Sequence, residues 1–354
     1  MATIEELRSK IDDLDRRIVD LLNERATLAR KIARRKRERK TDPFVPARER
    51  QVFDSIVAHN PGPLPDQAVV DIYRAVIAAM RSLEHPLRIV YWGPPGSFTQ
   101  MAALRKFGSL PDTRAMAQVE DIFSEIEKRG ADYGVVPMEN STEGAVRATL
   151  DMFFNSNLRI CSEIYLDIEH YLLGHGGAED IKRVYSNPQV LAQCRGWLRG
   201  HLPDAELIEV ATSSRGAERA AREPDSGAIG TALAAELYGL KIISERIEDL
   251  PGNRTRFLVI GHTESEPSGK DKTSIMFSVP HRPGALHEAL GVLEKYDINM
   301  TMIEARPGRQ QPFEYVFFID FQGHADDPHV AKAVAQLQDT CLFLKVLGSY
   351  PEAE

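Results

Sequence analysis

Two basic residues in the N-terminal segment have the types and spacing of an anion-binding pair. Apolar residues recur every three or four positions there, and Arg25 interrupts the repeat between Leu21 and Leu28. A guanidinium keeps its charge, so in an apolar seam it is costly unless an anionic group meets it. Lys36 follows eleven residues later, about three turns and roughly 16 Å further along nearly the same side of a helix. Such a pair can clasp a small anion, although a coiled-coil seam with one tolerated arginine explains Arg25 equally well.

A single long helix must position this pair, and its apolar repeat indicates a second chain. Thr3 and Glu6 form a capping-box pattern, which predicts a helix from Ile4 to about Lys40. Arg8 would lie about 25 Å from Arg25 along this helix, so it can join the same pocket only from an antiparallel helix of another chain. The heptad spacing therefore predicts a homodimer. The apolar seam consists of Ile4, Leu7, Ile11, Leu14, Ile18, Leu21, Leu28 and Ile32.

Two shorter helices are expected after the first, at about Pro46–His59 and Asp66–Glu84, because prolines interrupt the chain around them. Arg48 and Glu49 open the second helix, where a carboxylate is also favourable simply because of the helix dipole. Glu84 borders the apolar stripe of the third helix. A partly buried carboxyl group there is readily protonated, whereas a solvated last turn is the alternative.

This helical segment resembles the all-helical chorismate mutase family. The resemblance implies an intertwined dimer that rearranges chorismate to prephenate, a pericyclic reaction that needs charge stabilisation and no nucleophile. It implies that Arg8 and Arg25 hold two carboxylates, and that Lys36 and Glu84 meet the breaking ether. Val45 and Glu84 stand where some members have Asp and Gln, so Glu84 must be protonated to donate. The implied chorismate-binding residues are Arg8, Arg25, Lys36, Arg48, Glu49 (to the ring hydroxyl) and Glu84, of which Arg25, Lys36 and Glu84 are catalytic.

From residue 87 the pattern changes to short buried strands that alternate with helices, beginning with the strand 87–92. This is typical of an α/β fold, and we expect two lobes with a ligand in the cleft between them. Hydroxyl and amide side chains gather in the segments 139–144, 212–214 and 253–257. Singly, such residues more often cap helices or form turns. Together at strand ends, they can hold a polar, dicarboxylic ligand.

Several segments, including GPPGSFT at 93–99, VPMENSTEG at 136–144, YSNPQVLAQC at 185–194 and NRTRF at 253–257, resemble prephenate dehydratase. The resemblance implies a fold like that of two-lobed periplasmic binding proteins, and loss of carbon dioxide and the ring hydroxyl to give phenylpyruvate. Thr255 is implied as the critical catalytic residue, polarised by a neighbouring dipole or cation. Arg256 either holds the lobe together or binds a substrate carboxylate. Asn187 stands where the family often has His. The predicted prephenate-binding residues are Asn140, Ser141, Thr142, Ser213, Thr255, Arg256 and Phe257.

Residues 273–354 have the order β-α-β-β-α-β, which predicts a ferredoxin-like α+β unit. The unit resembles the ACT regulatory domain and carries the segments 284–287 (GALH) and 304–307 (EARP), which accompany feedback inhibition by L-phenylalanine in dehydratases. Glycine allows a ligand close to a helix N-terminus, where free N–H groups favour a carboxylate; an ordinary turn is the alternative. Ala305 stands where Ser is usual. The predicted effector-binding residues are Gly284, Ala285, Leu286, Glu304 and Arg306.

Composition excludes several other classes of protein. The net charge of −8 over 354 residues argues against a dedicated nucleic-acid binder, although the basic run 30–40 leaves that reading testable by salt-dependent retention on DNA or RNA. Neither a signal peptide nor an apolar run long enough to span a bilayer is present. The three separated cysteines indicate reduced thiols in a cytoplasmic protein. We expect no metal and no cofactor.

In order, the segments predict a chorismate mutase domain at 1–86, a prephenate dehydratase domain at 87–262, a linker at 263–272 and an ACT domain at 273–354. We therefore predict a bifunctional enzyme of phenylalanine biosynthesis that is inhibited by L-phenylalanine. A dehydratase that prefers arogenate is the alternative within the same chemistry. A non-catalytic amino-acid sensor is the alternative from another class, and it would need no hydroxyl at Thr255.

Overall fold

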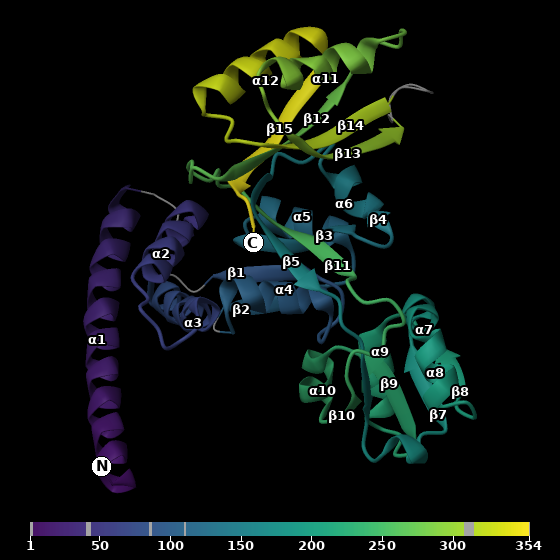
Figure 1. Ribbon diagram of the computed structural model, residues 1–354. Helices are drawn as coiled ribbons and strands as arrows, with labels where there is room; N and C mark the ends of the chain where they lie inside the picture. The colour runs from purple at the N-terminus through teal and green to yellow at the C-terminus, as the bar shows by residue number, and fades with distance from the viewer. Residues whose placement is uncertain (1–2, 40–43, 85–86, 110, 308–314, 354) are drawn as a thin grey trace. The chain divides into compact units, whose positions relative to one another are not determined.

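The computed structural model describes residues 3–39, 44–84, 87–109, 111–307 and 315–353. The chain forms two compact units, whose elements are labelled in Figure 1. The first unit contains residues 1–87 together with the short segment 107–112. The second contains residues 88–106 and 113–354.

Three helices make up most of the first unit: α1 (Ile4–Arg39), α2 (Pro46–Ala58) and α3 (Asp66–Glu84). The predicted capping box begins α1, because the Thr3 N–H donates to Glu6 Oε2 at 2.9 Å and the Glu6 N–H donates to Thr3 Oγ1 at 3.2 Å. Pro46 stands in the first turn of α2, where its missing N–H costs nothing. Helix α3 contacts both α1 and α2. The three predicted helices are therefore confirmed within one or two residues at each end.

The apolar seam of α1 is exposed. Its eight residues, from Ile4 to Ile32, each expose between 50 and 65% of their surface. Ala29 and Ala33 are buried instead, and α1 contacts α3. An apolar face this exposed, along a helix of about 54 Å, is typical of a surface that contacts another protein chain.

The first lobe of the second unit is built on a mixed sheet with the strand order β2-β1-β3-β11-β5. Strand β1 (Arg88–Trp92) runs parallel to β3 (Tyr133–Asn140), and β11 (Arg254–Gly261) runs antiparallel to β3 and β5 (Arg159–Asp167). β2 (Asp112–Met116) is at the edge, and β4 (Gly144–Ala145) pairs with β3. The lobe also contains α4 (Phe98–Phe107), α5 (Val119–Glu127) and α6 (Arg147–Met152). Because β11 lies between β3 and β5, its residues pair with both neighbouring strands.

The second lobe is a smaller sheet with the order β10-β6-β9-β7-β8. Its strands are β6 (Tyr171–Gly174), β7 (Arg183–Ser186), β8 (Glu206–Glu209), β9 (Ser226–Gly230) and β10 (Lys241–Ser244). Its helices are α7 (Pro188–Gln193), α8 (Arg195–His201), α9 (Ser213–Ala220) and α10 (Ala232–Tyr238). The chain enters this lobe after β5 and returns to the first lobe at β11. The predicted two-lobed α/β fold is thus confirmed. The sequence predicts strands at 87–92, 133–136, 207–210, 228–230, 241–247 and 256–260, so it misses β2, β4, β5, β6 and β7.

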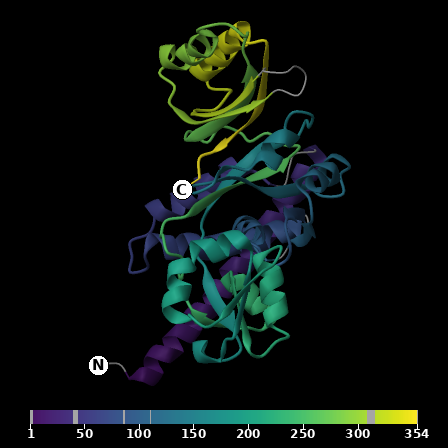
Figure 2. The same cartoon turned by 90° about the vertical axis from the view of Figure 1, so that its right-hand side faces the viewer.

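The C-terminal part is the predicted β-α-β-β-α-β unit, with the antiparallel strand order β13-β14-β12-β15. Its elements are β12 (Asp271–Ser278), α11 (Ala285–Lys295), β13 (Met300–Pro307), β14 (Tyr315–Gln322), α12 (Pro328–Thr340) and β15 (Phe343–Pro351). Helices α11 and α12 cover one face of the sheet (Figure 2) and share an apolar core with it. On the other face, Met276, Phe318 and Tyr350 join the core around α5 and α6 of the first lobe.

The predicted linker 263–272 is partly a packed connection. The Ser265 hydroxyl donates to the Cys161 carbonyl at 2.8 Å, and the Ser265 carbonyl contacts His324 Nε2 at 2.9 Å. Strand β12 begins at Asp271, two residues earlier than predicted. Among the described residues, no helix is both long and apolar enough to cross a membrane.

Candidate functional site

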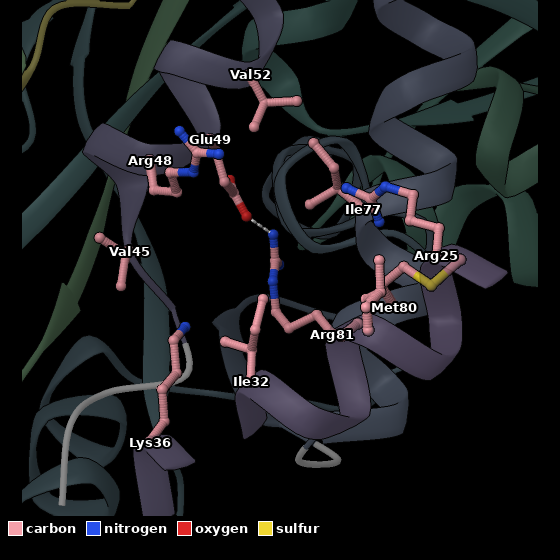
Figure 3. A pocket seen from close by; sticks show the side chains of 12 residues that line it. Arg25, Ile32, Lys36, Val45, Arg48, Glu49, Val52, Ile77, Met80 and Arg81 are labelled. Carbon is pink, nitrogen blue, oxygen red and sulfur yellow. Dashed lines mark hydrogen bonds and ion pairs between the residues drawn. The ribbon is translucent and has the colours of Figure 1, made fainter. Parts of the chain in front are cut away.

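The first unit contains a pocket of about 310 Å³, which is lined by three of the four predicted cationic residues. Arg25 and Lys36 reach it from α1, and Arg48 from the first turn of α2 (Figure 3). Glu49 and Arg81 also line the pocket. Its apolar walls consist of Leu28, Ala29, Ile32, Val45, Val52, Ile77 and Met80. The pocket thus combines apolar walls with several positive charges, which suits a small anionic ligand that carries an apolar ring.

Glu49 and Arg81 form an ion pair inside this pocket, between α2 and α3 (Figure 3). Their side chains are 13% and 7% exposed, respectively. The Arg81 guanidinium also lies over the rings of Phe44 and Phe107, with distances of 4.9 and 5.7 Å to the ring centroids. Arg81 and Glu49 thus pair with each other in the pocket lining, which also contains the cations Arg25, Lys36 and Arg48.

Arg81 was missed by the sequence analysis. It lies four residues after Ile77 and one after Met80, so it falls on the apolar stripe of α3. An arginine on an apolar stripe was the signal that could have indicated a pocket residue. The same kind of signal indicated Arg25 in the seam of α1.

Two predicted mutase residues remain, Arg8 and Glu84. Arg8 is exposed on the first turns of α1 and does not line the pocket of its own chain. Glu84 ends α3, and its side chain lies outside the described part of the structure.

In the second unit, Asn140 and Thr255 meet where β3 ends and β11 begins. They are register partners, and Asn140 Nδ2 donates to Thr255 Oγ1 and to Asn253 Oδ1, at 2.7 Å each. Asn140 Oδ1 accepts from the backbone N–H groups of Thr142 (2.9 Å) and Glu143 (3.2 Å). These bonds fix the orientation of the amide. Since the Thr255 oxygen accepts a hydrogen bond from Asn140, its own O–H proton is left to be donated elsewhere.

Ser141 pins the loop that follows β3 to the start of β11. The Ser141 N–H donates to the Arg254 carbonyl, and the Arg254 N–H donates to Ser141 Oγ, both at 2.9 Å. Thr142 is exposed beside it. In the second lobe, Ser213 begins α9, and its hydroxyl oxygen lies 3.0 Å from that of Ser186.

The two lobes touch at Gly96. The Thr231 hydroxyl donates to the Gly96 carbonyl at 2.7 Å, and a side chain at position 96 would come within 3.1 Å of Ala234 Cβ. With a φ of +81°, this position favours glycine for its backbone as well.

Arg256 and Phe257 were predicted to bind prephenate, and the structure buries both. Phe257 is 2% exposed. The Arg256 guanidinium is 3% exposed and pairs with Glu163 and Asp320. Prephenate binding by these two residues therefore stays a prediction. The alternative in which Arg256 holds the lobe is the one that agrees with the structure.

The polar residues Asn187 and His170 both make hydrogen bonds within the second lobe. Asn187 caps α7, because its Oδ1 accepts from the Val190 N–H at 2.8 Å. His170, which the sequence analysis missed, is 1% exposed and contacts Gln193 Oε1 through Nε2 at 2.8 Å. Burial lowers the pKa of His170 from its ordinary value, so its imidazole is neutral at physiological pH.

In the C-terminal unit, Gly284 precedes α11 with a φ of +82°, a left-handed conformation that side chains rarely adopt. Ala285 is buried in the first turn of the helix, and Leu286 packs against the core of the unit. Glu304 and Arg306 lie on the same face of the edge strand β13, since side chains alternate along a strand. Arg306 donates to Asp151 of α6 at 2.9 Å.

Among the described residues, no group of His, Cys, Asp or Glu side chains has a metal-binding arrangement.

Three family models match consecutive segments of the chain. The chorismate mutase type II model matches residues 7–85, the prephenate dehydratase model matches residues 89–265, and the ACT domain model matches residues 273–339. The fold and these matches define a helical mutase segment joined to a two-lobed dehydratase and an ACT regulatory domain.

Similarity to a curated protein extends over the full length. The bifunctional chorismate mutase/prephenate dehydratase of Aquifex aeolicus (strain VF5) is 43% identical over 358 residues, which cover 100% of this chain and 99% of that protein. The chain therefore belongs to the bifunctional chorismate mutase/prephenate dehydratase family. It carries both activities, and the sensor alternative without catalysis is set aside.

Two solved structures resemble the second unit. The prephenate dehydratase from Arthrobacter aurescens in complex with L-Phe is 32% identical, with a TM-score of 0.70, and the match covers 75% of this chain and 90% of that one. A quorum quenching acylase, GqqA, has the same TM-score of 0.70 at 27% identity, covering 75% of this chain and 98% of that one. The fold alone does not decide the activity, which depends on the residues of the site.

Proposed function

We propose that chorismate is rearranged in the pocket formed by α1, α2 and α3. The observation that carries this proposal is the set of three cations, Arg25, Lys36 and Arg48, around a largely apolar pocket of about 310 Å³. Chorismate carries two carboxylates, which match the cations, and a ring, which matches the apolar walls. Catalysis requires charges placed where negative charge develops in the transition state. Lys36 and a protonated Glu84 are the proposed donors to the breaking ether, and Glu49 is proposed for the ring hydroxyl.

The mutase pocket is completed in this proposal by Arg8 of a second chain. The exposed seam of α1 supports a homodimer in which two such helices run antiparallel, so that each covers the other's apolar residues. Arg25 and Arg8 then hold one substrate carboxylate each. An oligomer larger than a dimer is compatible with this arrangement.

For the dehydratase, we propose that Thr255 donates a proton to the departing ring hydroxyl of prephenate as carbon dioxide leaves. The supporting observation is the hydrogen bond from Asn140 Nδ2 to Thr255 Oγ1, which occupies a lone pair of the oxygen and leaves its O–H proton to be donated. A threonine hydroxyl is a weak acid, so the polar surroundings must share its charge in the transition state. Asn140, Ser141, Thr142 and Ser213 are the proposed binding residues.

We further propose that L-phenylalanine inhibits the enzyme by binding to the ACT domain, through Gly284, Ala285, Leu286, Glu304 and Arg306. The L-Phe complex of the Arthrobacter relative supports phenylalanine as the effector. The proposed domain boundaries are 1–86, 87–262 and 273–354, with the connection 263–272 between the last two. A cytoplasmic location is proposed from the reduced cysteines Cys161, Cys194 and Cys341.

One incubation tests the combination. The purified chain receives chorismate alone, and prephenate and phenylpyruvate are followed by chromatography with and without phenylalanine. Phenylpyruvate formation that falls on addition of phenylalanine is the expected result. Prephenate that accumulates without phenylpyruvate would contradict either the role of Thr255 or the preference of the dehydratase site for prephenate. Supplying arogenate directly separates these two explanations.

A further inference from the structure

A buried group of charged and hydroxyl side chains joins the first lobe to the C-terminal sheet. We define the Arg256 cluster as Arg256, Glu163, Lys272, Asp320, Ser274 and Tyr350. Arg256 lies on β11 and Glu163 on β5 of the first lobe, and the other members lie on β12, β14 and β15. The four charged side chains are between 0 and 5% exposed, so the cluster is shielded from water.

Arg256 uses each nitrogen of its guanidinium fork. Its Nε donates to Glu163 Oε2 at 2.7 Å, its Nη2 to Tyr350 Oη at 2.8 Å, and its Nη1 to Asp320 Oδ2. Lys272 Nζ donates to both Glu163 oxygens, at 2.9 and 3.0 Å. Two cations and two carboxylates make the cluster neutral, which is the condition under which buried charges are tolerated.

The remaining bonds close a ring. Ser274 donates to Asp320 Oδ1, so the Tyr350 hydroxyl, 2.6 Å from Ser274 Oγ, must donate to Ser274. Burial and the Asp320 carboxylate raise the pKa of Tyr350 well above its ordinary value, which keeps the phenol protonated for this bond. The orientation of Arg256 is thus fixed from the C-terminal sheet by Asp320 and Tyr350 together.

Thr255 directly precedes Arg256 on β11. Successive side chains of a strand point to opposite faces, and here Thr255 contacts Asn140 while Arg256 contacts the C-terminal sheet. The pairing of β11 with β3 shifts register between Arg256 and Phe257. Such an irregularity re-aims the neighbouring side chains, so an anchor at position 256 sets where the hydroxyl at position 255 lies.

We propose that Asp320 and Tyr350 position the Thr255 hydroxyl for dehydration by holding Arg256, which makes the ACT sheet part of the dehydratase machinery even without an effector. This inference rests on the proposed role of Thr255. A purely structural role, in which the cluster only fastens the sheet to the lobe, is the competing explanation.

The same interface offers a matched control. Arg306 of β13 donates to Asp151 of α6 at 2.9 Å, so this ion pair also fastens the C-terminal sheet to the first lobe. It does not involve β11. Substituting Asp151 therefore removes an ion pair from the same interface and leaves the Arg256 cluster intact.

The experiment compares Tyr350→Phe, Asp320→Asn and Asp151→Asn in the full chain, without phenylalanine. Tyr350→Phe removes one hydroxyl and no charge, and we expect its dehydratase kcat to fall about tenfold with KM for prephenate unchanged. Asp320→Asn should lose more. Asp151→Asn should keep the wild-type kcat. The mutase activity of all three variants should be unchanged, and thermal unfolding of each chain verifies that its second unit is folded.

Wild-type dehydratase kcat in Tyr350→Phe would overturn the proposal, and so would an equal loss in Asp151→Asn. If Asp320→Asn does not fold, Tyr350→Phe alone decides. Thr255→Ala is assayed in parallel, because full dehydratase activity in that variant would refute the proposed role of Thr255 itself. Loss in Thr255→Ala without loss in Tyr350→Phe refutes only the positioning role.

Discussion

Two inactive mutase variants should restore activity when they are mixed. Arg8 and Arg25 lie on one helix, about 25 Å apart along its axis, and the pocket is lined by Arg25 but not by Arg8 of the same chain. Replacing either guanidinium by Ala removes a partner of a substrate carboxylate, which costs about 3 kcal/mol or more than 100-fold in kcat/KM. Arg8→Ala and Arg25→Ala should therefore each be nearly inactive alone.

In a mixed dimer, one pocket receives Arg25 from the Arg8→Ala chain and Arg8 from the Arg25→Ala chain, so it is intact. The other pocket lacks both. Random exchange at equal amounts puts half of the chains into mixed dimers, each with one working site, which gives about a quarter of wild-type mutase activity. Chorismate consumption is measured after subunit exchange, and dehydratase activity calibrates the amount of folded protein.

A mixture of Arg25→Ala with Lys36→Ala is the matched control. Both side chains reach the pocket from the same helix, so every mixed dimer has two defective sites and no activity should return. Mass spectrometry of the intact complex verifies that mixed dimers have formed. Their presence without any recovery for Arg8→Ala with Arg25→Ala would refute the shared pocket, as would a fully active Arg8→Ala chain.

Four substitutions test the remaining assignments. Thr255→Ala should lower phenylpyruvate formation by 100-fold or more, about the size of a general-acid contribution, while prephenate formation from chorismate continues; chromatography of both products measures this, and loss of both would indicate a structural role. Glu84→Gln should flatten a mutase rate that otherwise falls as pH rises, because glutamine donates without needing a proton; an unchanged pH profile would contradict a protonated Glu84. Arg81→Leu should destabilise the helical unit by about 3–5 kcal/mol, since it leaves the mostly buried Glu49 carboxylate unpaired; thermal unfolding measures this, and Arg81→Leu combined with Glu49→Leu should recover part of the loss. Gly284→Val should weaken phenylalanine inhibition without lowering the uninhibited dehydratase rate, because a branched side chain is strained at a φ of +82°; inhibition curves for variant and wild type decide, and identical curves would count against this effector site.

The helices and the C-terminal unit were predictable because their signals are local. A capping box at Thr3 and Glu6, an apolar repeat and flanking prolines are read within a few residues of one another. The same is true of the order of elements in the C-terminal unit. These predictions required no knowledge of which distant residues would meet.

Strand β5 was not predicted because its buried polar residues hide the usual pattern. Glu163 lies in the middle of this strand and is fully enclosed, yet a glutamate normally indicates an exposed position. Its partners, Arg256 and Lys272, follow 93 and 109 residues later in the sequence. Burial of Glu163 is favourable only once these partners are in place, so no local window of sequence could reveal it.

The candidate sites divide in the same way. The cations of α1 and α2 were found because they interrupt an apolar repeat or begin a helix, and the hydroxyl-rich loop around Asn140 was found from its composition. Arg256 was assigned a choice of roles because strand alternation places it on the opposite face from Thr255, but the sequence does not show which distant residues cover that face.

The Arg256 cluster also limits how this enzyme can be rearranged by recombination. A crossover near residues 263–272 would separate Glu163 and Arg256 from Asp320, although the Arg256–Asp320 ion pair joins the two sides. A C-terminal module that carried an apolar residue in place of Asp320 would leave Arg256 and Lys272 facing the single carboxylate of Glu163. Modules of this kind are therefore exchangeable only when both sides of the junction change together, and residues 163, 256, 272 and 320 are expected to be inherited as one unit.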